Sequence, residues 1–198
     1  GPAPYSGPSP GRGGTVRAMS LNEDPVSPTA DAASPEEVQA LRERLDPLLP
    51  AAIEDLKDLV RIPSIAFEGY DREPVRRSAE AVAELLRGAG MQQVEIESVA
   101  GGSPAVIGRS PAAPGRPTVL LYAHYDVVPA NNPEAWTNNP FELTEREGRW
   151  YGRGAADCKG NLAMHLEALR LIEEHGGTDL GLKVVVEGSE ELGGEDGL

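Results

Sequence analysis

The sequence predicts an α/β domain built in layers, with a mixed sheet flanked by helices. Segments with strand-like apolar runs alternate along the chain with segments whose apolar residues recur every three or four positions. The 198 residues and 21.0 kDa correspond to one ordinary domain. The early part is crowded with Gly and Pro and poor in large apolar residues, so we expect residues 1–35 to be disordered and residues 36–198 to fold.

The first predicted helix begins at Pro35. Ser34 and Glu37 have the pattern of a capping box, in which each side chain accepts a hydrogen bond from the other residue's backbone N–H. The apolar stripe that follows is interrupted by Pro47 and Pro50. Because proline in a helix interior removes a hydrogen bond and clashes with the preceding turn, we expect the helix to break there and to resume as a second piece.

A further amphipathic helix and three strands follow. The apolar stripe of this helix ends at Gly88 and Gly90, which suit a helix C-terminus. Strands are expected at residues 94–98, 105–108 and 118–122. The last of these has no polar alternation, which is typical of a strand covered on both faces.

The rest of the chain predicts a hairpin, a helix and a last strand. The segment FELTEREGRWYGRG indicates two short strands joined by a Glu-Gly turn. Apolar residues at helical spacing over 162–172 predict a helix that ends at Gly176 and Gly177, and residues 182–186 predict a buried strand. Because the sequence stops at Leu198, soon after that strand, we expect it to be the N-terminal piece of a longer chain.

Charge and composition exclude several classes of partner. The chain has 18 Lys and Arg against 32 Asp and Glu, for a formal net charge of −14, which argues against nucleic acid. A single cysteine cannot form an intrachain disulfide and favours a reducing compartment, the cytoplasm. No apolar run reaches the roughly 18 residues of a membrane span, so no membrane partner is expected.

Two clusters of ligand-type side chains follow predicted strands or turns. His124 and Asp126 are two positions apart after a strand, so they can share a face, with the carboxylate fixing the imidazole tautomer. The alternative is a hydrogen-bonded histidine beside a turn aspartate. Asp157 lies among closely spaced glycines just before a helix, where it could bridge two cations or simply cap the helix.

A third cluster contains adjacent acids. Glu190 and Glu191 follow the last strand and can point in different directions, one toward a metal and one toward its bound water. The alternative is a solvated acidic loop. His124, Asp157 and Glu190 are separated by two intervals of 33 residues, which indicates that successive units of one sheet deliver them.

The segments HYDVVPA, NPFELTEREGRWYGRGAADCKGN and EGSEELGG resemble the M20 family of zinc metallopeptidases, and most of all its cytosolic dipeptidase branch. LVRIPSI, residues 59–65, resembles that family's N-terminal helix and the loop after it. The resemblance covers residue 36 to the end, so residues 36–198 are expected to be the N-terminal part of the metallopeptidase catalytic domain.

The resemblance implies a role for each matched residue. His124 binds one zinc, Asp157 bridges two, and Glu191 binds the other. Asp126 orients His124 and Glu190 is the general base. Two Zn²⁺ per complete chain are implied, with Mn²⁺ or Co²⁺ as alternatives. The family likeness also implies a cis peptide bond after Asp157, while the following cysteine is expected to be a bystander.

The implied activity is zinc-dependent hydrolysis of peptide bonds in dipeptides or short peptides, by a metal-bridged water activated by a Glu general base. An N-acyl-amino-acid amidohydrolase or carboxypeptidase of the same family is one alternative, and a non-catalytic truncated α/β module is another. The family pattern requires later ligands and a lid domain that this sequence does not contain. The fragment alone is therefore expected to be inactive, and the full-length protein allows a homodimer.

Overall fold

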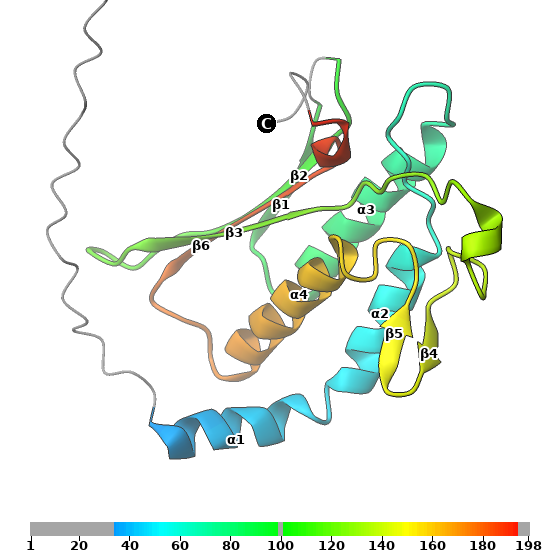
Figure 1. The fold of residues 1–198 in the computed structure, drawn as a ribbon. Helices are drawn as coiled ribbons and strands as arrows, with labels where there is room; N and C mark the ends of the chain where they lie inside the picture. Colours follow the sequence, from blue (N-terminus) through cyan, green and yellow to red (C-terminus); the bar gives the residue numbers. More distant parts are fainter. Residues whose placement is uncertain (1–33, 99–100, 194–198) are drawn as a thin grey trace, which may run out of the picture.

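The structure is a computed structural model that describes residues 34–98 and 101–193. Its central element is a four-stranded mixed sheet (Figure 1). The strand order is β1-β2-β6-β3. β2 is antiparallel to both of its neighbours, whereas β3 and β6 are parallel. The strands are β1 (Gln93–Glu97), β2 (Ala105–Ser110), β3 (Thr118–His124) and β6 (Gly181–Glu187).

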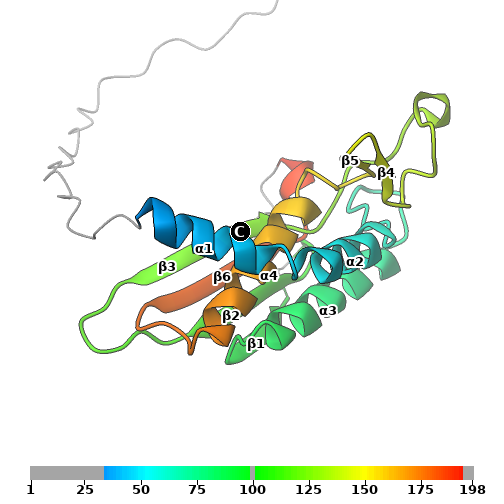
Figure 2. The ribbon, with the colours of Figure 1, turned by 90° about the horizontal axis from the view of Figure 1, so that it is seen from below.

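The described helices cover one face of this sheet. α3 lies against β1 and β2, α4 lies against β3, and α2 lies against α4 and α3. Figures 1 and 2 show α3 and α4 on the same side of the strands, with α1 leading into α2. The predicted fold class, a mixed sheet flanked by helices, is confirmed. The helices are α1 (Pro35–Leu45), α2 (Leu49–Val60), α3 (Glu73–Gly88) and α4 (Lys159–Glu174).

The predicted capping box starts α1. The Ser34 N–H donates to the Glu37 carboxylate at 2.7 Å, and the Glu37 N–H donates to Ser34 Oγ at 3.2 Å. The helix ends before Pro47, and α2 begins at Leu49 with proline in its first turn. The break predicted from the two prolines is therefore confirmed. Proline is tolerated in the first turn of a helix, because an N–H group there would have no acceptor within the helix.

The predicted hairpin is formed by β4 (Thr144–Arg146) and β5 (Arg149–Tyr151), which pair antiparallel apart from the main sheet. Its two turn residues, Glu147 and Gly148, have φ of 53° and 73°. Two successive residues with positive φ match the twist of a two-residue hairpin turn, which glycine enters readily. The Glu145 carboxylate accepts the Gly148 N–H at 2.6 Å and supports the turn.

The core lies between the sheet and the two helices that cover it. It contains apolar side chains from β2, β6, α3 and α4, and no water-accessible surface remains on the central ones. Tight packing makes each of these side chains costly to truncate. Representative members are Val106, Val184, Val186, Leu86, Leu162 and Leu166.

The expectation that residues 118–122 are covered on both faces is wrong for the described structure. Leu120 is 60% exposed and Tyr122 is 48% exposed. β3 is an edge strand that pairs with β6 alone among the described residues, and the described helices lie on one face of the sheet. An apolar run indicates that a strand can be buried on both faces. Whether the second face is covered depends on other segments that pack against it.

Two other expectations have a limited bearing on the described residues. The predicted disorder of residues 1–35 lies, for residues 1–33, outside the described structure, and Ser34 and Pro35 form the cap and first turn of α1. Within residues 34–98 and 101–193, no helix combines the length and apolar character needed to cross a membrane.

The packing predicts how much one core side chain of α4 contributes to stability. Leu166→Ala removes a side chain with 0% exposure and should lower the free energy of unfolding by about 2–5 kcal/mol, because it leaves a cavity against the sheet. Met164→Ala in the same helix is the control, since Met164 is 65% exposed and should change stability by less than about 0.5 kcal/mol. Urea denaturation measures both, and equal losses would contradict the packing described here.

Candidate functional site

The site lies at the carboxyl edge of the two parallel strands. His124 ends β3 and pairs in register with Glu187, which ends β6. The chain returns to this edge after the hairpin, where Asp157 precedes the start of α4. Carboxyl ends of parallel strands are where open α/β sheets place their ligand sites, and this topology explains why segments 33 residues apart meet there.

His124 is buried and faces three acidic residues. Its Nε2 is 3.0 Å from Asp157 Oδ1 and 3.7 Å from Glu190 Oε2. On the other side of the ring, Nδ1 is 3.3 Å from Asp126 Oδ1 and 3.2 Å from the Asp126 backbone oxygen. The structure therefore brings His124, Asp126, Asp157 and Glu190 together. The sequence predicts this meeting, because the residues follow strands or turns that reach the same edge of the sheet.

Asp126 connects this histidine to the acidic segment after β6. Its side chain has 0% exposure, and its two carboxylate oxygens accept the backbone N–H groups of Glu190 and Glu191 at 3.3 and 3.0 Å. A buried carboxylate requires such donors, because water no longer solvates its charge. One side chain thus fixes both His124 and the start of η2 (Glu190–Leu192).

The charges of the cluster shift several pKa values. Burial opposes protonation of His124, but hydrogen bonds and charges from Asp126 and Cys158 outweigh it and raise the pKa of the imidazole to about 11. Burial, followed by the charge of Asp157, raises the pKa of Glu191 above its usual range. Crowded acids that raise one another's pKa values favour a bound cation, which removes the repulsion.

The donor atoms fit a divalent cation of the zinc type. A nitrogen of His124, an oxygen of Asp157 and the Cys158 sulfur all lie within 4.8 Å of one another. Imidazole, carboxylate and thiolate are the groups that bind zinc in proteins. Cys158, expected to be a bystander, belongs to this group of atoms, whereas Glu191 does not. The peptide bond between Asp157 and Cys158 is cis, as the family resemblance implies.

A buried lysine that the sequence analysis missed joins the start of α4 to the end of α2 and the residues after it. Lys159 has 0% exposure, and its Nζ donates to the carbonyl oxygens of Leu59 and Ile62 at 2.8 and 2.7 Å. Burial lowers the pKa of this ammonium to about 7, while the charge of Asp126 opposes that shift. Lysine is usually exposed, and nothing in the surrounding glycine-rich sequence marks this one as buried.

The segment after α2 also supports the strand end beside His124. Ser64 Oγ donates to the Tyr125 backbone oxygen at 2.6 Å, and the Val127 N–H donates to the Ser64 backbone oxygen at 3.1 Å. Ser64 is fully buried. The LVRIPSI segment is therefore in contact with the residues that follow His124 through both the side chain and the backbone of Ser64, which the sequence pattern alone did not show.

Tyr125 packs against the turn that leads to Glu190. It is fully buried, and its hydroxyl donates to the Pro104 backbone oxygen at 2.6 Å. A Cβ atom at Gly188 would lie 2.2 Å from this hydroxyl. Glycine is therefore required here, because a side chain would displace either Tyr125 or the backbone before the acidic pair.

The α/β fold and this cluster are together typical of a metal-dependent hydrolase. The profile described as Peptidase family M20/M25/M40 matches residues 120–198. A cysteinylglycine-S-conjugate dipeptidase from Corynebacterium striatum is 73% identical over 93 residues, which cover 47% of this chain and 20% of that protein.

Two further similarities cover more of the chain. The Cys-Gly metallodipeptidase dug1 from Schizosaccharomyces pombe is 35% identical over 150 residues, covering 71% of this chain and 32% of its own length. The crystal structure of human carnosine dipeptidase 1 matches with a TM-score of 0.71 at 25% identity, covering 80% of this chain and 36% of that one. The chain matches the M20 family of metallopeptidases over residues 120–198, and the relatives named above are dipeptidases, as its motifs predict. It spans a fifth to a third of the length of these curated relatives.

The close approach at Gly188 predicts a position-specific glycine effect. Gly188→Ala should lower the free energy of unfolding by about 1–3 kcal/mol, because the added methyl group overlaps the Tyr125 hydroxyl. Gly88→Ala in α3 is the control. Its Cβ would meet no atom within 4 Å, and alanine is the better helix former, so this change should be neutral or stabilising. Thermal denaturation of both variants checks the prediction, and a stable Gly188→Ala protein would show that the approach is not tight.

Proposed function

We propose that the protein carrying this chain hydrolyses the peptide bond of dipeptides or short peptides in a zinc-dependent reaction. The observation that carries the proposal is the meeting of His124, Asp157 and Glu190 at one sheet edge, with the His124 Nε2 at 3.0 Å from the Asp157 carboxylate. The similarity to proteins named as dipeptidases supports the substrate class.

The proposed metal ligands are the three residues matched by the family motif. His124 and Asp157 would hold one zinc, and Asp157 and Glu191 would hold the other. The exposed Asp157 side chain, 78% accessible, is free to present both oxygens. Catalytic zinc takes about three protein ligands, so each ion needs a further ligand from the whole protein. Mn²⁺ and Co²⁺ accept similar ligands and remain alternatives.

The acid–base work falls to Glu190. Two divalent cations, when bound, lower the pKa of a shared water and polarise the scissile carbonyl. Glu190 begins η2, its Oε2 lies 3.7 Å from His124 Nε2, and its side chain is 46% accessible, so its carboxylate can reach a water at the cluster. It accepts the proton of that water and passes it to the leaving amine. Asp126 Oδ1 lies 3.3 Å from Nδ1, which leaves Nε2 as the nitrogen that faces the proposed metal centre.

The wider setting belongs to the same proposal. It places residues 36–198 in the N-terminal part of the catalytic domain and the enzyme in the cytoplasm, and it allows a homodimer of the full-length protein. The N-acyl-amino-acid amidohydrolase, carboxypeptidase and non-catalytic alternatives are separated by one assay. Release of free amino acids from Cys-Gly supports the dipeptidase, and cleavage of N-acetyl-amino acids alone supports the amidohydrolase. Release of the C-terminal residue of a longer peptide, without cleavage of Cys-Gly, supports the carboxypeptidase, and cleavage of none of these substrates at full zinc loading supports the non-catalytic module.

The general-base assignment predicts a selective loss. Glu190→Gln in the full-length enzyme should lower kcat by about 100-fold or more, because the amide cannot accept the proton, while zinc content stays unchanged. Amino-acid release from a dipeptide and metal analysis of the same sample measure the two quantities. Glu174→Gln at the exposed end of α4 is the matched control and should leave both intact. Full activity of Glu190→Gln would remove this residue from the mechanism.

The ligand assignment predicts a loss of metal. His124→Ala and Asp157→Asn should each reduce bound zinc in the full-length protein, with the larger loss for Asp157→Asn because its carboxylate serves both ions. Elemental analysis after dialysis against a weak chelator gives the stoichiometry, expected to be about two per chain before substitution. Retention of both ions by Asp157→Asn would contradict the bridging role.

A further inference from the structure

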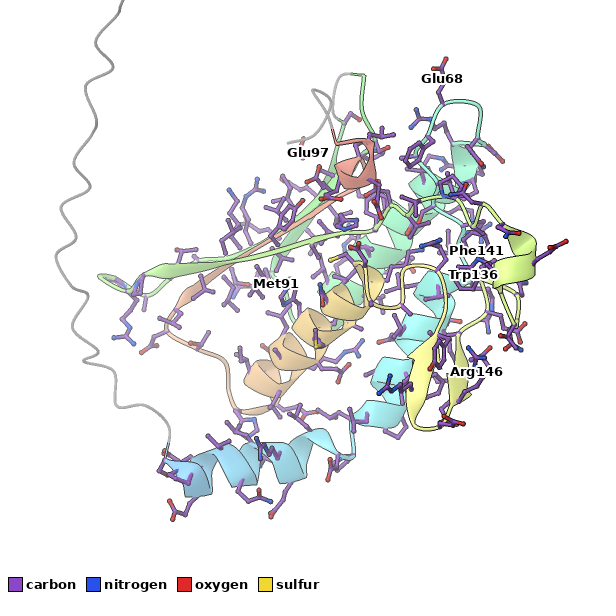
Figure 3. All side chains as sticks on the ribbon, viewed as in Figure 1. Glu68, Met91, Glu97, Trp136, Phe141 and Arg146 are labelled. Carbon is purple, nitrogen blue, oxygen red and sulfur yellow. The ribbon has the colours of Figure 1, made fainter. Side chains whose placement is uncertain are left out.

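A cavity of about 550 Å³ lies beside the β4–β5 hairpin, between the hairpin and the loop that contains η1 (Pro133–Ala135). Trp136 and Tyr151 contribute its aromatic walls, and Arg146 and Arg153 its charges. Figure 3 shows the labelled side chains of Trp136 and Arg146 on the hairpin side of the molecule. None of the residues of the proposed metal centre lines this cavity.

The charge of the cavity is opposite to that of the chain. The sequence has a formal net charge of −14 and 32 acidic residues, yet the lining contains two arginines and neither aspartate nor glutamate. The guanidinium groups lie near aromatic rings, with Arg146 Cζ 4.1 Å from the Tyr151 centroid and Arg153 Cζ 5.2 Å from the Trp136 centroid. Ring contacts hold a guanidinium through its face and leave the N–H groups at its edge free to donate.

Hydrogen bonding leaves the cavity rich in donors. Arg153 Nη2 donates to the Pro129 backbone oxygen at 3.4 Å, while its Nε is buried and has no hydrogen-bond partner among the described residues. The side-chain oxygens of Asn132 and Asn139 accept the backbone N–H groups of Glu134 and Phe141, which directs each amide NH₂ away from that backbone. The accessible N–H groups of the two guanidiniums, rather than the buried Nε, are therefore the donors that an acceptor in the cavity could meet.

We propose that this cavity is a binding site for a small organic carboxylate. A planar carboxylate presents two oxygens in the geometry that a guanidinium edge matches, and the aromatic walls can pack against the apolar part of the ligand. The site is independent of the hydrolytic reaction proposed above.

Calorimetric titration of the metal-free protein tests the assignment. Succinate is the probe, succinamide is the neutral analogue of similar size, and inorganic phosphate represents a non-carboxylate anion. Removing metal beforehand prevents these anions from binding zinc. At low ionic strength, succinate should bind saturably, succinamide should not bind, and phosphate should bind more weakly than succinate.

Substitutions locate the binding. Arg153→Gln and Arg146→Gln should each weaken succinate binding about tenfold or more, the loss expected for a hydrogen bond to a charged group. Arg149→Gln is the matched control, because this arginine belongs to the same hairpin but does not line the cavity. Circular dichroism verifies folding, and Arg146→Gln carries the test if Arg153→Gln fails to fold.

Three results would overturn the proposal. The first is the absence of a saturable heat signal with succinate up to about 10 mM, a concentration at which even millimolar affinity is detectable. The second is a loss of succinate affinity in Arg149→Gln equal to the loss in the two cavity variants. The third is tighter binding of phosphate than of succinate, which would identify the cavity as a phosphate site. Because hydrolysis is not measured, failure of this proposal leaves the proposed peptidase function unaffected, and the reverse is also true.

Discussion

The buried carboxylate of Asp126 is the constraint on which the site depends. Its charge has no access to water, so the fold must supply hydrogen-bond donors, and these are the backbone N–H groups of Glu190 and Glu191. The same carboxylate lies beside His124 Nδ1. The cost of burying one charge is thereby offset by contacts that fix two parts of the site separated by more than sixty residues in sequence.

The surrounding structure keeps this arrangement rigid. Ser64 holds the strand end at Tyr125 and Val127, and Lys159 joins the start of α4 to the last turn of α2. These contacts are buried, so losing one leaves an unpaired polar group in a place that water does not reach. Burial, followed by the charge of Asp157, raises the pKa of Glu191, and contacts with Asp126 and Cys158 raise the pKa of His124 against the effect of burial. Such an arrangement of charges is stabilised by a cation, which links the packing of the fold to its chemistry.

Local sequence patterns predicted most of the elements, because caps, proline breaks and turns depend on neighbouring residues. The capping box at Ser34 and the hairpin turn at Glu147 are examples. Motif spacing predicts that the candidate residues meet, since strand ends at one sheet edge lie close together, and the family resemblance implies their individual roles. The exposure of Leu120 and the burial of Lys159 were not predictable, because both depend on which distant segments cover them. The position of Cys158 among the ligand atoms depends on the same tertiary contacts.

The central claim is that the sheet edge at His124 is a metal centre, and an anomalous diffraction map at the zinc edge, from crystals of the full-length protein grown with zinc, tests it most directly. The account predicts a peak about 2.0–2.2 Å from both His124 Nε2 and one Asp157 oxygen, and a second peak within bonding distance of the other Asp157 oxygen. Zinc bound only to exposed acids elsewhere, with none within bonding distance of His124 Nε2, would contradict it.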